Sequence, residues 1–234
     1  MSIVIPALLT PSRDDLEEKL TRLVGLVEAV QIDVIDGRFV GPPTWPYTVE
    51  GGVRELSLPR PAPFHYEVDL MVENPEEVAG AWIEAGVERI LVHIESARAL
   101  PRFVRELRDK YGHDKGFAPG LLSFGLAINI DTDSAALEPY LEATDYVQFM
   151  GIRTIGKQGL PFDPRVIRKI EAFKKAHPDV TIQVDGAVNL ESAPQLLAAG
   201  VDRLAIGSAL WKAPDLAAEI AKFEALAAEY GRYA

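Results

Sequence analysis

The chain has 234 residues, a formal net charge of −11 and no cysteine. This length suits one large domain or two small ones. The acidic balance disfavours binding to nucleic acid or anionic membranes, because no run of basic residues offsets it. Without cysteine, disulfides and thiolate metal sites are excluded.

Neither a secretory signal nor a membrane span is predicted. The segment Met1–Leu9 is too short for a charged flank, an apolar stretch and a cleavage site. No apolar run reaches the roughly 18 residues that a membrane-spanning helix needs. We therefore expect a cytoplasmic protein.

Short apolar runs alternate with longer amphipathic segments along the whole chain. The runs are rich in Val, Ile and Leu, as in parallel strands buried on both faces. In chain order we expect strand Ile3–Leu9, helix Arg13–Val27, strand Ala29–Ile35, strand Phe64–Met71, helix Pro75–Ala85, strand Arg89–His93, helix Leu100–Tyr111, strand Phe124–Ile130, helix Ser134–Leu141, strand Tyr146–Met150, helix Pro164–Ala176, strand Thr181–Val184, helix Leu190–Ala199, strand Arg203–Ile206 and helix Pro214–Tyr230.

Local signals support these boundaries. Ser12 precedes an acidic first turn, as an N-cap does. Gly86 and Gly200 follow helical segments and precede strands, as left-handed C-caps do. The stretch Phe39–Arg60 is rich in Pro and Gly, and we expect it to combine a functional loop with a short helix.

The repeated strand–helix units imply either a closed barrel or an open doubly wound sheet. The segment Thr10–Asp15 after the first strand contains no glycine, so no G-x-G-x-x-G motif is present there. This absence argues against a dinucleotide-binding fold. We expect one (β/α)₈ barrel domain over residues 1–234, an α/β fold of the TIM-barrel type.

Carboxylates lie in or just after the apolar strands. Asp33, Asp69 and Asp185 are near the carboxyl ends of three strands, and Gln31 shares a strand face with Asp33. Burying a carboxylate is costly unless it is paired or binds a ligand. A turn or cap would explain any one of them, and Asp36 before Gly37 fits such a turn. The three together predict a site at the rim where barrel active sites lie.

Two turns with glycine could hold a phosphate. One contains Gly186 and Ala187 after the seventh strand, and the other contains Gly207 and Ser208 after the eighth. The loops after these strands form the usual phosphate site of such barrels. The segment Gly151–Phe162 has three glycines and two cations, which fits either a lid over the substrate or an ordinary solvated loop.

The histidines fall into two groups. His93 and Glu95 flank the end of the fourth strand. We expect His65 to be a buried core residue at the start of its strand, and His113 and His177 to be surface residues in loops.

These features together resemble the ribulose-phosphate 3-epimerase family over roughly Ile3 to Ala213. The segment Asp33–Val40 is similar to the family's D-V-M-D-G-R-F-V. The further matches are Val68–Met71 with V-H-L-M, Val92–Glu95 with V-H-V-E, Val184–Val188 with V-D-G-G-V, and Gly207–Ala209 with G-S-A.

The resemblance implies an isomerase that epimerises a ketopentose phosphate, or a ketohexose phosphate, through an enediolate. Asp33 and Asp185 would be the acid–base pair on opposite sides of the sugar. A divalent metal would stabilise the enediolate oxygens. The resemblance also implies that substrate or phosphate is bound at Met71, Gly156, Gly159, Gly186, Ala187, Gly207 and Ser208.

This sequence departs from the family at the metal site. Gln31 and Asp69 stand where the family has two histidines, and Ala7 replaces the serine of its P-S-I-L-S start. The loop after the sixth strand departs from P-G-F-G-G-Q and is one residue longer. The metal positions then offer Gln31, Asp33, Asp69 and Asp185, all with oxygen donors. Such a set favours magnesium or manganese over zinc.

Two functions from different classes remain open. One is an active sugar-phosphate epimerase, and the other is a barrel that binds a sugar phosphate without catalysis. A decarboxylase of the related phosphate barrels is disfavoured, because Asp33–Asp36 lacks the lysine of D-x-K-x-x-D. We expect a small phosphorylated sugar as the partner, with neither nucleic acid nor membrane, and the sequence leaves homo-oligomerisation open.

Overall fold

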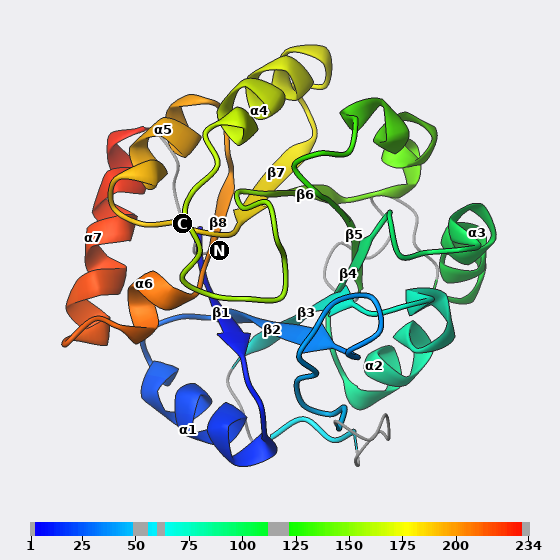
Figure 1. The fold of residues 1–234 in the computed structure, drawn as a ribbon, viewed down its shortest axis with the longest axis horizontal. Coiled ribbons are helices and arrows are strands. Elements are labelled where there is room, and N and C mark those ends of the chain that lie inside the picture. The colour runs from blue at the N-terminus through cyan, green and yellow to red at the C-terminus, as the bar shows by residue number, and fades with distance from the viewer. Residues whose placement is uncertain (1–2, 49–55, 60–63, 112–121, 231–234) are drawn as a thin grey trace.

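The computed structural model describes residues 3–48, 56–59, 64–111 and 122–230. Its eight parallel strands close into a barrel in chain order, with β1 paired to β8 (Figure 1). The strands are β1 (Val4–Leu9), β2 (Ala29–Ile35), β3 (His65–Met71), β4 (Arg89–His93), β5 (Ser123–Ile128), β6 (Tyr146–Met150), β7 (Thr181–Asp185) and β8 (Arg203–Ile206).

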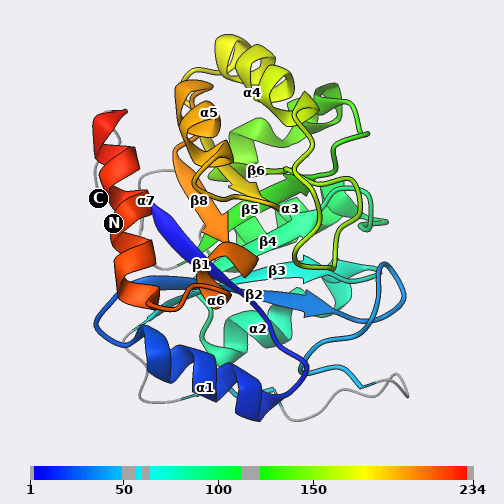
Figure 2. The ribbon, with the colours of Figure 1, turned by 60° about the vertical axis from the view of Figure 1, so that its left-hand side comes forward.

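The helices are α1 (Arg13–Leu23), η1 (Pro75–Glu77), α2 (Ala79–Ala85), α3 (Leu100–Tyr111), η2 (Ser134–Ala143), α4 (Arg165–Ala176), α5 (Ser192–Ala198), α6 (Ser208–Trp211) and α7 (Leu216–Glu229), where η marks a 3₁₀ helix. The helices α1, α2, α3, α4, α5 and α7 follow one another around the outside of the barrel in chain order, and the short α6 lies next to the end of β8 (Figures 1 and 2). This arrangement is a TIM barrel, so the expected fold class is confirmed.

The helices differ from the expected boundaries for local reasons. The expected helix over Ser134–Leu141 is a 3₁₀ segment, Ser134–Ala143, with Pro139 inside it. Proline lacks the N–H that an α-helix needs at that position. The described residues 39–48 and 56–59 contain no helix, and residues 49–55 and 60 of the expected loop-and-helix stretch lie outside the described parts.

The helix α1 shows how the sequence produces the outer layer. The Ser12 side chain accepts a hydrogen bond from the Asp15 N–H at its amino end, which satisfies a backbone donor that the helix leaves free. Leu16, Leu20 and Leu23 recur at helical spacing and are all buried. One stripe of the helix therefore packs on the strands, and the rest faces solvent.

The interior of the barrel is unusually polar for a core. Gln31, Glu67, Gln148 and Gln183 are fully buried there. A side chain on Gly125 would collide with the Tyr146 ring, so this glycine makes room for the ring inside the barrel. Buried polar groups of this kind require hydrogen-bond partners.

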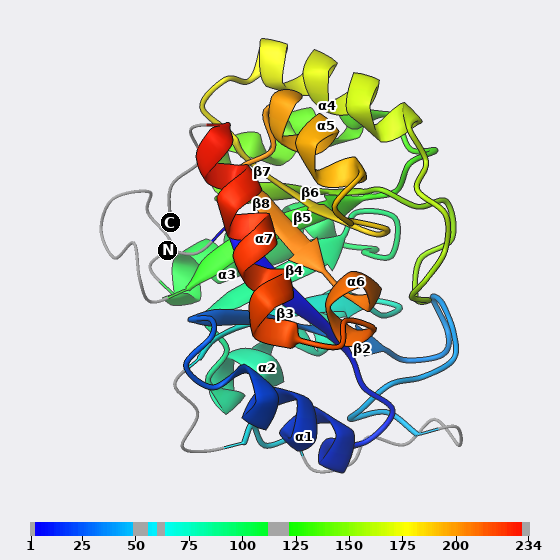
Figure 3. The same cartoon turned by 90° about the vertical axis from the view of Figure 1, so that its left-hand side faces the viewer.

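The loops after β2 and β6 project from the same end of the barrel (Figure 3). This end holds the carboxyl termini of the parallel strands, where the expected site residues lie. Among the described residues, none of the helices has the length and apolar character needed to cross a membrane.

Candidate active site

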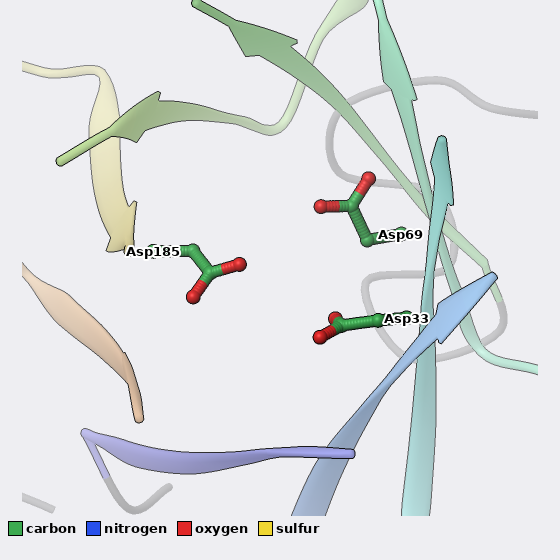
Figure 4. A group of neighbouring side chains, drawn as sticks. All are labelled: Asp33, Asp69 and Asp185. Atoms are coloured by element: carbon green, nitrogen blue, oxygen red, sulfur yellow. The ribbon is translucent and has the colours of Figure 1, made fainter. Parts of the chain in front are cut away.

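Three aspartates converge inside the carboxyl end of the barrel (Figure 4). Asp33 and Asp69 are register partners on β2 and β3, and Asp185 ends β7 on the opposite side. Their nearest ligand oxygens all lie within 4.8 Å of one another. The structure thus brings together the three carboxylates that the sequence placed at strand ends.

Burial and mutual repulsion change how these acids titrate. Burial, followed by the charges of Asp185 and Asp69, raises the pKa of Asp33 well above its ordinary value. Burial and the Asp69 charge raise the pKa of Asp185 to about 7. Clustered carboxylates share protons in this way because full ionisation places like charges together in a medium of low polarity.

Gln31 lies in the cluster but presents its amide hydrogens to it. Its Nε2 donates to Asp33 Oδ1 at 2.9 Å and to Asp185 Oδ2 at 3.3 Å. Its Oε1 accepts from Gln183 Nε2 at 3.0 Å, on the side away from the acids. In this arrangement Gln31 offers no oxygen to a cation among the aspartates, and its role as a ligand stays a prediction that requires the amide to turn over.

His93 is the functional candidate for which sequence reasoning assigned no role. It is fully buried on β4, with Nε2 3.3 Å from Asp69 Oδ1 and Nδ1 3.6 Å from Glu95 Oε2. Burial lowers the pKa of His93, but Asp69 and Glu95 together outweigh burial and raise it to about 10. The two neighbouring carboxylates therefore favour the protonated imidazole beside the acid cluster. In the sequence, the signal that could have indicated a role for His93 is the motif Val92–Glu95, V-H-I-E.

Neither His65 nor His177 lies in the site. His65 was expected in the core, and that prediction was wrong. Its side chain is half exposed, and Nδ1 lies 2.6 Å from Glu88 Oε2, because the first residue of β3 stands at the outer edge of the barrel. His177 follows α4 and contacts Glu138 near the surface, and His113 lies outside the described residues.

Asp36 has the turn role expected for it. Its Oδ1 accepts from the N–H groups of Arg38 and Phe39, and its Oδ2 accepts from the Glu73 N–H. Gly37 has φ 78°, a left-handed conformation that suits glycine. The turn ties the loop after β2 to the loop after β3, which supports the strands carrying Asp33 and Asp69.

A pocket opens beside the aspartates. Asp33 and Asp185 line one part of it, the methionines Met71 and Met150 line another, and the turns after β7 and β8 line the rest. Every residue expected to bind substrate or phosphate lines this pocket: Met71, Gly156, Gly159, Gly186, Ala187, Gly207 and Ser208.

The loop between β6 and α4 crosses the mouth of the barrel (Figure 1). Gly156 and Gly159 have φ of 79° and 78°, so its turns depend on left-handed residues. Gln158 reaches inward and donates to the Ala7 carbonyl at 3.4 Å. A Cβ atom on Gly207 would lie 2.5 Å from Gln158 Nε2, so the loop and the β8 turn share one space.

Two comparisons with known proteins decide the family. The model of the ribulose-phosphate 3 epimerase family matches residues 3–211. The chain belongs to this family. The ribulose-phosphate 3-epimerase of Aquifex aeolicus (strain VF5) is 27% identical over 235 residues, covering 97% of each chain. That of Bacillus subtilis (strain 168) is 30% identical over 197 residues, covering 82% of this chain and 83% of the relative.

Solved structures support the fold alone. The 3-hexulose-6-phosphate synthase from Salmonella typhimurium superposes with a TM-score of 0.65 at 16% identity, covering 98% of this chain and 100% of that one. The orotidine 5'-monophosphate decarboxylase from Sulfolobus solfataricus superposes with a TM-score of 0.60 at 10% identity, covering 99% of this chain and 100% of that one. Identities this low leave the chemistry to be argued from the site.

Proposed function

We propose that this protein epimerises a ketopentose phosphate, or a ketohexose phosphate, through an enediolate, with Asp33 and Asp185 as the acid–base pair. The observation that carries the proposal is that these two carboxylates approach from opposite sides of the barrel and line one pocket. Family membership supplies the substrate class.

The reaction requires one ionised and one protonated carboxyl group. The ionised aspartate takes the proton from the carbon beside the ketone, and the electrons of that C–H bond form the enediolate. The protonated aspartate then returns a proton to the opposite face of the same carbon. Raised pKa values of Asp33 and Asp185 favour such a shared-proton state near neutral pH.

The donor set fits a hard divalent cation. Asp33, Asp69 and Asp185 offer carboxylate oxygens that lie within 4.8 Å of one another, and Asp69 Oδ1 also lies 3.3 Å from His93 Nε2. Oxygen-only sites favour magnesium or manganese over zinc. A cation held by these residues would supply electrostatic stabilisation of the negative charge that develops on the substrate oxygens.

The phosphate would lie at the far end of the pocket, against the turns 186–188 and 207–208. Both turns line the same pocket as the two catalytic aspartates, which matches a short sugar phosphate that reaches from the acids to the turns. Lys157 also lines this pocket and adds a positive charge in an otherwise acidic protein. Met71 and Met150 would cover the apolar side of the sugar.

The test is deuterium incorporation from D₂O into ribulose phosphate, followed by NMR with magnesium, manganese or zinc added. We expect label at the carbon beside the ketone, and loss of labelling by at least about a hundredfold in Asp33→Asn and Asp185→Asn. Asp179→Asn is the matched control, because this aspartate is exposed and precedes the amino end of β7, whereas Asp185 stands at the carboxyl end.

Binding of ribulose phosphate by the unmodified protein without any exchange would reject catalysis. That result would favour the alternative, a barrel that binds the sugar phosphate and does not turn it over. Calorimetry of the same samples separates the two outcomes, because it measures binding whether or not exchange occurs.

A further inference from the structure

A layer of buried amides lies directly beneath the three aspartates. Gln31 (β2), Gln148 (β6) and Gln183 (β7) point into the barrel and have no solvent exposure. Glu67 of β3 is the register partner of Gln31, and Gln148 is the register partner of Gln183. The four residues therefore form one level of the interior. On β2, β3 and β7 this level lies two residues before the aspartate, and on β6 it lies two residues before Met150.

The amide of Gln183 has one favourable orientation. Its Nε2 lies within hydrogen-bond distance of three oxygens: Glu67 Oε1 at 2.5 Å, Gln148 Oε1 at 2.8 Å and Gln31 Oε1 at 3.0 Å. Because the amide has two hydrogens, one of them is shared between two of these oxygens. Turning the amide over would place its carbonyl oxygen against a carboxylate. Burial raises the pKa of Glu67, but Arg89, with Nη1 3.8 Å from Glu67 Oε2, opposes that rise and favours the acceptor form.

The orientation of Gln183 determines that of its two neighbours. Because their oxygens face Gln183, Gln31 and Gln148 direct their N–H groups toward the rim. Gln31 donates to Asp33 and Asp185, and Gln148 Nε2 donates to Asp69 Oδ2 at 2.9 Å. Each aspartate thus accepts an N–H from this layer.

We infer that Gln183, aligned by Glu67, is a positioning residue that fixes the amides of Gln31 and Gln148 and through them the three aspartates. The inference rests on the proposed function for its kinetic consequence, whereas the amide arrangement stands on the hydrogen bonds alone. The donors hold one oxygen of each carboxyl group. Among the described residues, the second oxygen of Asp69 faces His93 and that of Asp185 accepts from the Gly186 N–H at 2.7 Å, whereas that of Asp33 is left for substrate or a cation. Reversed amides would direct carbonyl oxygens at the carboxylates and repel them.

The kinetic test uses Gln183→Met, which keeps the length of the side chain and removes its hydrogen bonds. We expect kcat to fall by about tenfold, with the KM for ribulose phosphate within about twofold of the unmodified value, because the phosphate turns are untouched. Gln195→Met on α5, where the glutamine is exposed, is the matched control. The inference would be overturned if kcat fell equally in Gln183→Met and in the control Gln195→Met. A change in KM alone for Gln183→Met would also overturn it.

Glu67→Gln is the second variant, in case Gln183→Met does not fold. It keeps the shape of the side chain and removes the carboxylate that favours one orientation of Gln183. We expect a smaller fall in kcat with KM unchanged. An unchanged kcat in this variant would reject the role of Glu67 in alignment.

A neutron crystal structure of the deuterated protein provides a readout that does not depend on activity. We expect deuterons on Gln31 and Gln148 to point toward the aspartates, and reversed or mixed amides in the Gln183→Met variant. Reversed amides in an active, unmodified protein would refute the positioning role. If the amides of Gln31 and Gln148 have the expected orientation but the protein shows no exchange activity, the proposed function is rejected and the alignment by Gln183 stands.

Discussion

The imidazole of His93 and the carboxylate of Asp69 form a fully buried contact, with Nε2 3.3 Å from Oδ1. Asp69 stands where the family resemblance places a histidine, so this site has one more negative charge than that pattern. His93, with a pKa raised to about 10, provides a positive charge next to the added carboxylate. A protonated His93 offsets part of the negative charge that the added carboxylate brings to the cluster.

Replacing His93 should therefore destabilise the protein far more than replacing an exposed histidine. We expect His93→Asn to lower the free energy of unfolding by about 3 kcal/mol, since it leaves Asp69 buried without its partner. The control is His65→Asn, whose exposed contact with Glu88 is worth less than about 1 kcal/mol. Urea denaturation at pH 7 measures both, and equal losses would contradict the role of His93.

Without a divalent cation, stability should fall as pH rises through neutrality. The raised pKa of Asp185, about 7, means that the folded protein keeps a proton there that the unfolded chain releases near its ordinary value of 3.8. This stabilisation is fully present below about pH 4 and is lost as pH rises through 7. The corresponding stabilisation from His93 is fully present below about pH 6.5 and is lost as pH rises through 10.

Thermal melts in a chelator from pH 5 to 9 measure this dependence. We expect Tm to decline over that range, and the decline to be shallower in Asp33→Asn, because the variant cannot ionise at that position. Asp179→Asn should follow the unmodified protein. A flat or rising Tm would show that the acids are not protonated in the folded state.

Metal preference should follow the ligand atoms. We expect the chelator-treated protein to show no submicromolar zinc binding in calorimetric titration, and to bind manganese or magnesium through carboxylate oxygens. The double variant Gln31→His and Asp69→His restores nitrogen donors and should raise zinc affinity by at least about tenfold. Submicromolar zinc binding by the unmodified protein, lost in Asp69→Ala, would restore the ordinary metal site of the family.

Most of the fold was predictable because the information is local. Each of the eight strands is a short apolar run, and Gly86 and Gly200 end the helices before two of them in left-handed conformations, with φ of 100° and 103°. The carboxylates at strand ends were predictable for the same reason. Parallel strands bring their carboxyl ends to one rim, so Asp33, Asp69 and Asp185 had to be neighbours once the barrel closed.

The contacts that control the site were not predictable, because they join strands far apart in sequence. Gln31 was expected as an oxygen donor, and its orientation depends on Gln183, 152 residues away. The contact of His93 with Asp69 depends on how β4 is offset against β3. Periodicity within one strand shows which face a side chain occupies, but not which way an amide points once it is there.

The last prediction concerns the phosphate end of the pocket. We expect Gly207→Leu to raise the KM for ribulose phosphate by at least about tenfold, because its side chain would fill space beside Ser208. Tm should change little, since the nearest atoms belong to the end of the Gln158 side chain, which can move aside. Gly80→Leu on α2 is the control, because no atom lies within 4 Å of a Cβ there. Calorimetry with inorganic phosphate checks the assignment directly: unchanged phosphate affinity in Gly207→Leu would place the phosphate elsewhere in the pocket.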